Sequence, residues 1–456
     1  MRTLARAAAV SALVATLLSP GATQASPAAE GPPGPGALSY RLALEWNAVT
    51  HRLTGVERVT FTNTRKTPMT VVYLRLWPNS DEYGGSCAHR LMVVTHVVGG
   101  AARPLRVGCT VMPIELAEPL TTGASTTIGL SFVDAVPNLA QRFGFQGDFV
   151  NLATAFPIMA VTDDRATHLE APPLNGEGQY SLSASFAVTL TIPAGLTAAT
   201  TGVVTRGVTL ADGRRRLTVV AAHARDFTAV IGRFAVHTTT VGGTRLRYFE
   251  RPDARVPATT VLREWAAPAF AHMVRHYGAW YAPELDIVGE TRSFVDGGME
   301  YPQLIMTQLV ESTVTHEVAH MWFYDMVGNS QYVEPWLDES VSEFASERIV
   351  GENRACNVAA PFGRLAYALD ASMAQLDRLG SRYATLLYTA GPCVLEKLRR
   401  DWGDVRFDRM MRNYVATYRL RVATTARWKS TVRAFAPAAY DVDAFFRYAH
   451  LVTWPG

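Results

Sequence analysis

The chain has 456 residues, of which 48% are hydrophobic and 18% are charged, and its formal net charge is +3. A chain of this length and composition can bury a substantial core and divide into two or more domains. So small a net charge excludes an electrostatic basis for binding nucleic acid or an anionic membrane surface.

The first 25 residues differ in composition from the rest. Arg2 and Arg6 precede the apolar run Ala7–Leu18, and small residues follow as far as Ala25. This pattern predicts a secretory signal peptide over residues 1–25; a buried helix or membrane anchor is the alternative, but twelve apolar residues are short for a bilayer. Its removal lowers the formal charge to +1 and leaves residues 26–37, rich in Pro, Gly and Ala, as a flexible leader. We expect a secreted protein without a membrane anchor in its mature form.

Residues 38–240 are expected to form an N-terminal β domain. Short segments with alternating apolar residues are separated by turn residues, which is typical of strands. The clearest are Ser39–Trp46, Gly55–Asn63, Thr70–Leu76, Thr126–Phe132 and Ser183–Ile192. Strands of this kind predict an antiparallel sandwich or saddle.

In residues 241–456 the spacing of apolar residues differs from that in the β domain and predicts a second, mainly helical domain. Apolar residues recur at helical spacing in five segments: Thr260–Tyr281, Val310–Val327, Leu337–Val350, Pro361–Leu379 and Val394–Tyr418. Between the first two, Leu285–Gly289 and Met299–Thr307 have strand character. The fold class is therefore α+β.

Four cysteines lie beyond the predicted signal peptide, at positions 87, 109, 356 and 393. An oxidising compartment permits disulfides, and four cysteines allow three pairings. Proximity in sequence favours Cys87 with Cys109 and Cys356 with Cys393; four unpaired buried thiols are the alternative. No two of them have the spacing of a zinc knuckle.

The segment His316-Glu317-Val318-Ala319-His320 is the strongest indication of chemistry. Residues four apart on a helix share a face, so His316 and His320 can point two imidazoles at one metal ion. Glu317 lies about a hundred degrees round the helix, from where its carboxylate can reach a water on the metal without being a ligand. A chance match on a core helix is the alternative.

A hydrolytic zinc site has three protein ligands and one open position, so a third donor must lie elsewhere. Glu339, in the block Trp336-Leu337-Asp338-Glu339, opens the next predicted helix. With Trp322 and Phe323, the segment from His316 to Phe344 resembles the active-site signature of gluzincin aminopeptidases of the aminopeptidase N and leukotriene hydrolase family. The resemblance implies one zinc ion held by His316, His320 and Glu339, and a thermolysin-like catalytic domain.

Gly297-Gly298-Met299-Glu300-Tyr301-Pro302 resembles a second element of that family, a strand whose edge aligns the substrate backbone and whose Glu binds the free amino terminus. The resemblance assigns Gly297, Gly298 and Met299 to substrate binding and Glu300 to the amine. A carboxylate on an edge strand near the metal would attract an ammonium group, which favours removal of single residues. A solvated strand residue is the alternative for Glu300.

Tyr388-Thr389-Ala390-Gly391 resembles the family element whose Tyr hydroxyl donates to the oxyanion of the tetrahedral intermediate. A core-facing Tyr is the alternative for Tyr388. Glu343 follows Glu339 by one helical turn and is a candidate acceptor for a ligand His, although an exposed helix face explains it equally well.

Four residues depart from the family's pattern: Tyr301 in place of Asn, Asp338 in place of Asn, Ser340 in place of Gly and Ala390 in place of Lys. None removes a ligand or catalytic group, but with Tyr301 in place of Asn the sequence does not determine how the amino terminus of the substrate is bound. The large C-terminal helical domain of longer members has no counterpart here.

The resemblance implies a zinc aminopeptidase that hydrolyses the amino-terminal bond of peptide substrates, with Glu317 as general base. An endopeptidase or dedicated processing peptidase would use the same zinc chemistry with weak amine selection, and an inactive binding scaffold of the same fold is a further alternative. Nothing in the sequence indicates the oligomeric state.

Overall fold

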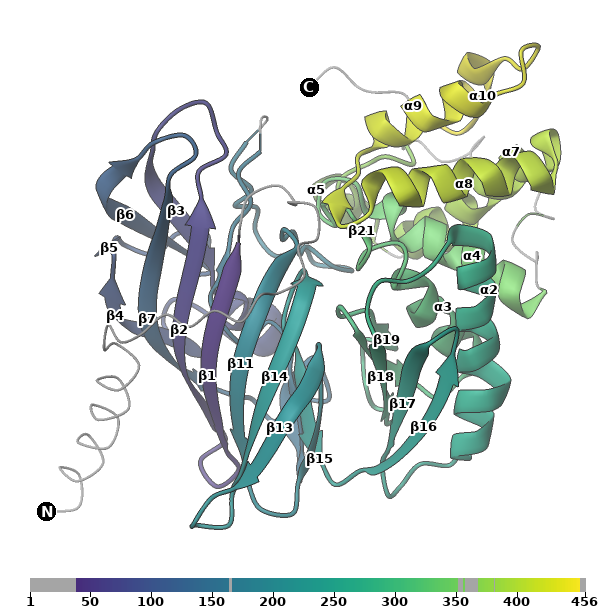
Figure 1. Ribbon diagram of the computed structural model, residues 1–456. Coiled ribbons are helices and arrows are strands. Elements are labelled where there is room, and N and C mark those ends of the chain that lie inside the picture. Colours follow the sequence, from purple (N-terminus) through teal and green to yellow (C-terminus); the bar gives the residue numbers. More distant parts are fainter. Residues whose placement is uncertain (1–37, 164–165, 352–355, 357–367, 381, 452–456) are drawn as a thin grey trace, which may run out of the picture.

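The computed structural model describes residues 38–163, 166–351, 356, 368–380 and 382–451 (Figure 1). The predicted signal peptide and leader lie outside the described residues, as does most of the first half of the predicted helix Pro361–Leu379. Within the described chain, a β-rich half and a helical half lie side by side (Figure 1). The predicted α+β architecture is therefore confirmed.

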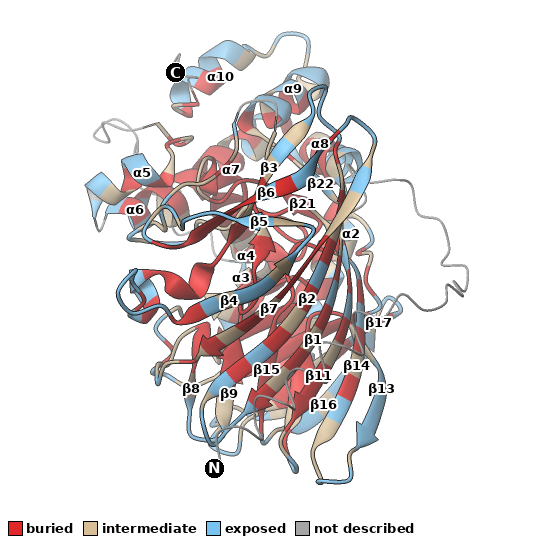
Figure 2. Ribbon diagram, turned by 90° about the vertical axis from the view of Figure 1, so that its left-hand side faces the viewer, coloured by how far each residue is buried: buried red, intermediate tan, exposed pale blue. Residues whose placement is uncertain are grey.

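A seven-stranded sheet forms the frame of the β half, in the order β13-β14-β11-β1-β2-β7-β4. Its neighbouring strands are antiparallel except β1 and β11, which run parallel. Side chains alternate along each strand, so Leu53, Val59 and Phe61 of β2 face the core while much of the edge strand β13 is exposed (Figure 2). The strands are β1 (Ser39–Asn47), β2 (Arg52–Thr62), β4 (Met92–Val98), β7 (Ser125–Ala135), β11 (Ala184–Ile192), β13 (Val203–Thr209) and β14 (Arg215–Ala224).

Two four-stranded sheets complete the β half, in the orders β10-β3-β6-β5 and β12-β15-β9-β8. Their inner side chains share one hydrophobic core with the seven-stranded sheet, as Leu74 and Ile231 illustrate. The first sheet contains β3 (Met69–Arg75), β5 (Gly100–Ala102), β6 (Val111–Leu120) and β10 (Ile158–Met159), and the second contains β8 (Phe143–Gln146), β9 (Phe149–Leu152), β12 (Thr197–Thr200) and β15 (Ala229–Gly232). Two short 3₁₀ turns, η1 (Trp77–Asn79) and η2 (Asp81–Tyr83), follow β3.

A five-stranded sheet adjoins the helices, in the order β16-β17-β18-β20-β19. It contains β16 (Ala235–Val241), β17 (Thr244–Glu250), β18 (Glu284–Glu290), β19 (Gly298–Met299) and β20 (Leu304–Gln308). The central pairs β17/β18 and β18/β20 are parallel, and β19 lies at the edge. Because β16 begins at Ala235, this sheet draws its first strand from the end of the predicted N-terminal domain; the boundary at residue 240 stays a prediction.

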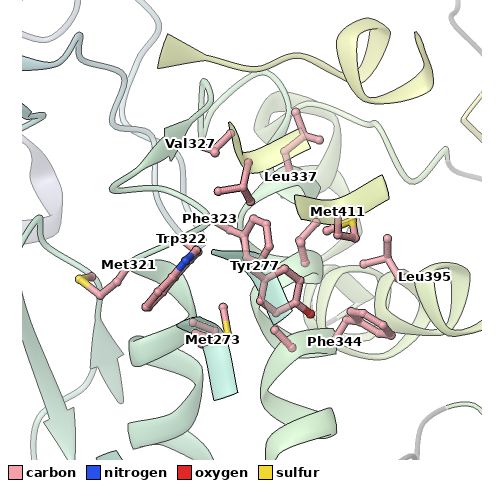
Figure 3. Close-up of a cluster of buried hydrophobic side chains, with 14 of the residues drawn as sticks. Met273, Tyr277, Met321, Trp322, Phe323, Val327, Leu337, Phe344, Leu395 and Met411 are labelled. Atoms are coloured by element: carbon pink, nitrogen blue, oxygen red, sulfur yellow. The ribbon is translucent and has the colours of Figure 1, made fainter. Parts of the chain in front are cut away.

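Helices of the second half pack around one large hydrophobic cluster. Figure 3 shows Met273 and Tyr277 of α2, Phe344 of α4, Leu395 of α7 and Met411 of α8 converging in it. The helices are α2 (Ala267–Tyr277), α3 (Glu311–His320), α4 (Glu339–Val350), α5 (Met373–Leu376), α6 (Arg382–Thr385), α7 (Gly391–Trp402), α8 (Asp404–Tyr418), α9 (Thr425–Phe435) and α10 (Val442–Tyr448). Shorter turns are η3 (Thr260–Ala266), η4 (Pro335–Leu337), η6 (Asp377–Leu379) and η7 (Leu386–Ala390), and β21 (Val327–Gly328) pairs with β22 (Arg421–Val422).

Two helices predicted from periodicity are shorter than expected. The predicted helix Val310–Val327 ends at His320, because the chain turns there and Tyr324 adopts a positive φ of 139°. The predicted helix Val394–Tyr418 is two helices, since Gly403, with φ of 76°, ends α7. Buried apolar residues continue through the turn after His320, and Phe407 is buried again after the exposed turn at Gly403, so periodicity alone predicted both helices to be too long.

Both cysteine pairs favoured by proximity are bonded in the structure. Cys87 pairs with Cys109 in the β half, and Cys356 pairs with Cys393 at the start of α7. Among the described residues, no helix combines the length and the apolar character needed to cross a bilayer.

Candidate active site

Helix α3 carries the two predicted histidine ligands. Val314, Val318 and Ala319 are fully buried in the helical core. The imidazoles of His316 and His320 lie one turn apart with their ring centroids 4.6 Å from each other, and both line the cleft between the two halves. Helix α3 is therefore amphipathic here: its apolar side packs in the core, and its polar side faces the cleft.

Three donor atoms converge at this face. His316 Nε2 lies 2.9 Å from His320 Nε2 and 3.3 Å from Glu339 Oε2, and His320 Nε2 lies 3.5 Å from the same oxygen. Glu339 comes from the first turn of α4, which packs against α3. Burial would raise the pKa of Glu339, but hydrogen bonds with the two imidazoles outweigh it and lower that pKa, so the carboxylate is ionised.

The outer ring nitrogens of both histidines have acceptors of their own. His316 Nδ1 lies 2.7 Å from Glu343 Oε2, and His320 Nδ1 lies 3.0 Å from the carbonyl oxygen of Phe323. If each ring keeps its Nδ1 proton and gives up the proton on Nε2 to make room for a metal ion, both Nε2 lone pairs are directed at the same point. Two imidazole nitrogens, one carboxylate oxygen and these supporting acceptors fit a tetrahedral zinc ion with one open position.

Glu317 faces the cleft beside these donors. Its Oε2 is buried without a hydrogen-bond partner among the described residues, and a Cβ at Gly298 would overlap its Oε1. Burial raises the pKa of Glu317 to about 8, although the two histidines act in the opposite direction. A buried carboxyl group with one free oxygen facing a cleft is placed to exchange a proton with a water molecule.

The segment around Glu300 forms one wall of the cleft. Gly298 and Met299 are the edge strand β19, as the predicted role requires, and Gly297, Gly298 and Glu300 line the cleft. Gln331 Nε2 donates a hydrogen bond of 2.6 Å to Glu300 Oε1. The side chain of Met299 instead packs into a hydrophobic cluster between the two halves.

Tyr301, which stands where the family has Asn, is buried in the same hydrophobic cluster as Met299. Its side chain is 2% exposed and is not among the residues that line the cleft. Replacement of the family's Asn therefore fills the space between the two halves and does not add a bulky group to the cleft.

Tyr388 lines the cleft from η7, a single π-helical turn that precedes α7. Its ring centroid lies 5.8 Å from that of His316. Ser340, a second departure, donates from Oγ to the carbonyl oxygen of Leu387 at 2.7 Å. A Cβ at Gly391 would overlap Ser340 Oγ. The departure thus ties the helix that carries Glu339 to the turn that carries Tyr388.

The remaining two departures have structural explanations. Asp338 caps α4 by accepting a 2.8 Å hydrogen bond from the backbone nitrogen of Glu339. Ala390 is fully buried in the helical core, where a Lys would lack solvent.

Sequence reasoning missed two acidic residues that line the cleft. Glu177 belongs to residues 171–182, an irregular segment of the β half that we call the arm, and Asp296 directly precedes Gly297. Carboxylate oxygens of Glu177, Glu300 and Glu339 all lie within 4.8 Å of one another. Only the turn-rich stretch around Glu177 marks it in the sequence, and such stretches are typical of ordinary loops.

The arm is held over the helical half. Asp377 of η6 accepts hydrogen bonds of 3.1 Å from the backbone nitrogens of Leu174 and Asn175. The backbone nitrogen of Gln331 donates to the carbonyl oxygen of Gln179 at 3.3 Å. These contacts place Glu177 in the cleft between the two halves, which has a volume of about 300 Å³.

An edge strand, a helix with two convergent histidines and a cleft rich in carboxylates together fit a metallohydrolase centre. Residues 264–448 match the family model described as the Peptidase family M1 domain. The second half of the chain is thus similar to a peptidase M1 domain, and the predicted resemblance to the gluzincin aminopeptidases is confirmed.

Relatives and solved structures agree with this assignment. The chain is 31% identical over 207 residues to the human protein "Aminopeptidase RNPEPL1", a match that covers 39% of this chain and 28% of that protein. "Probable aminopeptidase 2" of Sulfurisphaera tokodaii is 25% identical over 174 residues, which cover 35% of this chain and 21% of the relative. The matched region thus spans less than a third of each of these relatives.

Similarity of fold extends over nearly the whole chain. The M1 zinc metallopeptidase from Deinococcus radiodurans has a TM-score of 0.66 at 18% identity, and the alignment covers 92% of this chain and 95% of that one. A mutant of the same protein, solved with a Tyr-Ser-Ala substrate, gives the same score and coverage. The two-domain arrangement of this chain is therefore the fold of that metallopeptidase.

Proposed function

We propose that this protein is a zinc-dependent aminopeptidase that removes single residues from the amino terminus of peptides. The observation that carries the proposal is the convergence, in one cleft, of three metal donors, a free buried carboxyl group on Glu317 and the carboxylate of Glu300. The match to peptidase family M1 supports it.

The ion would be held by His316, His320 and Glu339. When bound, zinc supplies Lewis acidity, which acidifies a water molecule and polarises the peptide carbonyl. Glu317 accepts the proton of the attacking water and returns it to the leaving amine. The hydroxyl of Tyr388 donates to the developing oxyanion.

Selection of the amino terminus is assigned to Glu300, with Glu177 as a second carboxylate. The ammonium group of a substrate would replace the repulsion between these two acids with two charge-assisted hydrogen bonds. An internal peptide segment brings no such charge, so the same pair disfavours cleavage far from the amino terminus.

A panel of aminoacyl reporter substrates tests the proposal, each offered with a free and with an acetylated amino terminus. We expect hydrolysis of the free substrates, loss of that activity with a chelator and its return with zinc. Equal rates on free and acetylated substrates would instead indicate an endopeptidase or processing peptidase. No hydrolysis and no stoichiometric zinc in the purified protein would indicate a binding scaffold.

We also propose that the protein is secreted. The apolar run Ala7–Leu18, the small residues up to Ala25 and the two disulfides support an extracytoplasmic location. Mass spectrometry of the protein from culture medium should find a mature amino terminus at Ser26. A protein that stays in the cells with Met1 intact would contradict the proposal.

A further inference from the structure

Arg142, just before β8, is a buried cation surrounded by acids. Its side chain is 6% exposed. Nη2 donates to Asp296 Oδ1 at 2.7 Å and to Glu177 Oε1 at 3.1 Å, and Nε lies 3.5 Å from Glu82 Oε1. The guanidinium group thus joins three carboxylates at one point.

Two of these carboxylates line the cleft and come from different halves of the molecule. Glu177 belongs to the arm of the β half, whereas Asp296 directly precedes the substrate-binding segment that ends at Glu300. Arg142 itself is not among the residues that line the cleft. It therefore has no direct path to a bound peptide and can act on one only through its acidic partners.

Two hydrogen bonds from backbone nitrogens hold the segment that carries Arg142 beside the segment that carries Asp296. The backbone nitrogen of Arg142 donates to Asp296 Oδ2 at 3.1 Å, and that of Val295 donates to the carbonyl oxygen of Ala140 at 3.1 Å. The segment 140–142 therefore runs beside 295–296. A shift of Arg142 would move both the arm and the start of the substrate-binding segment.

The planar fork of an arginine is suited to this position. Carboxylates that face the same cleft repel one another in a medium of low dielectric, and a cation between them removes the repulsion. Arginine can satisfy both at once with parallel N–H donors, whereas lysine offers a single point charge on a flexible stem.

We propose that Arg142 is a positioning residue that sets selectivity for a free amino terminus, by holding Glu177 and, through Asp296, the segment that ends at Glu300 in the orientation that the substrate ammonium group requires. The inference rests on the proposed aminopeptidase function. Because Arg142 touches neither the peptide nor the zinc donors, its loss should weaken substrate binding and leave the chemical step nearly intact.

The experiment compares the full-length protein with Arg142→Gln, Arg142→Lys, Glu177→Gln and the double variant Arg142→Gln/Glu177→Gln. Arg247→Gln is the matched control, since Arg247 is also a largely buried arginine that pairs with two acids, Glu284 and Asp286, but lies away from the cleft. Each variant is assayed for kcat and KM on free and acetylated reporters, and for zinc content and melting temperature.

For Arg142→Gln we expect KM on free substrates to rise by roughly tenfold or more while kcat stays within about threefold of the unmodified protein. The ratio of free to acetylated hydrolysis should fall by a similar factor. Arg142→Lys should recover part of this loss. Arg247→Gln should lower the melting temperature without changing the ratio.

The double variant separates positioning from a general loss of structure. If Arg142 acts through Glu177, the double variant should be little worse than either single variant. Additive losses, or an unchanged free-to-acetylated ratio in a folded Arg142→Gln or Arg142→Lys protein, would overturn the inference. If Arg142→Gln does not fold, Arg142→Lys with Glu177→Gln provides the same cycle.

Failure of the proposed function has a different signature. It would appear in the unmodified protein as an absence of preference for the free amino terminus. The inference about Arg142 fails separately, when the unmodified protein has that preference but a folded Arg142 variant retains it in full or the double variant shows additive losses.

Discussion

The two halves of the molecule both bury carboxyl groups, but in different surroundings. In the β half, Glu57 of β2 and Asp134 of β7 are fully buried, and neither carboxyl group has a hydrogen-bond partner among the described residues. In the helical half, Glu317 and Glu300 are almost as buried but face a cleft that contains two histidines.

Burial alone therefore does not identify a catalytic acid. It raises the pKa of Glu57 well above its usual value, and it raises the pKa of Glu317 to about 8. Glu57 is buried in the β half and does not line the cleft, so it has no substrate with which to exchange its proton. Glu317 has one free oxygen, a cleft in front of it and metal donors beside it, and these neighbours make the difference.

The same amide substitution at Glu57 and at Glu317 is the clearest test of the difference between these two acids. Glu317→Gln should lower kcat/KM by about 10³-fold or more, because the general base is lost, while zinc content is retained. Glu57→Gln should leave kcat/KM unchanged. Steady-state kinetics with metal analysis checks both, and wild-type turnover in Glu317→Gln would refute the general-base assignment.

A second expected effect concerns the oxyanion. Tyr388→Phe should lower kcat by about 10²-fold with little change in KM, since one hydrogen-bond donor to the transition state is removed. Tyr248→Phe is the control, because Tyr248 is a buried tyrosine of β17 whose hydroxyl has no hydrogen-bond partner among the described residues. A kcat for Tyr388→Phe equal to that of the control would show that Tyr388 only packs.

The smallest expected effect sharpens the description of Glu57. Its raised pKa means that its contribution to stability is complete below the unfolded value of about 4.3 and is lost as pH rises toward the folded value. Glu57→Gln lacks this loss, so its stability relative to the unmodified protein should increase as pH rises above about 4.3, by at most about 1.4 kcal/mol per pH unit. Denaturant titrations at several pH values measure it, and parallel curves would indicate an ionised Glu57 in the folded state.

Local motifs indicated most of the candidate metal centre, which the structure brings together in one cleft. His316 and His320 face one point because four residues make about one helical turn, a property of the backbone that needs no tertiary contact. Helix ends were less predictable. α3 ends at His320 although apolar residues continue, because Trp322 and Phe323 are buried in the core as part of a turn.

The acidic end of the cleft lay beyond sequence reasoning. Glu177, Asp296 and Arg142 come from loops without periodicity, and a loop's position depends on the elements that it packs against. The arm reaches the cleft because Asp377 and Gln331 of the helical half hold it there. The burial of Tyr301 likewise depends on the packing of the two halves.

The sequence by itself thus determined which residues are the candidate zinc donors and the proposed general base, and how they are spaced, since these follow from helix geometry and side-chain chemistry. The tertiary structure alone decided that Arg142 of the β half joins Glu177 to Asp296, residues separated by more than a hundred positions in the chain. Ion pairs of that kind form only after the two halves pack together, so no local pattern can encode them.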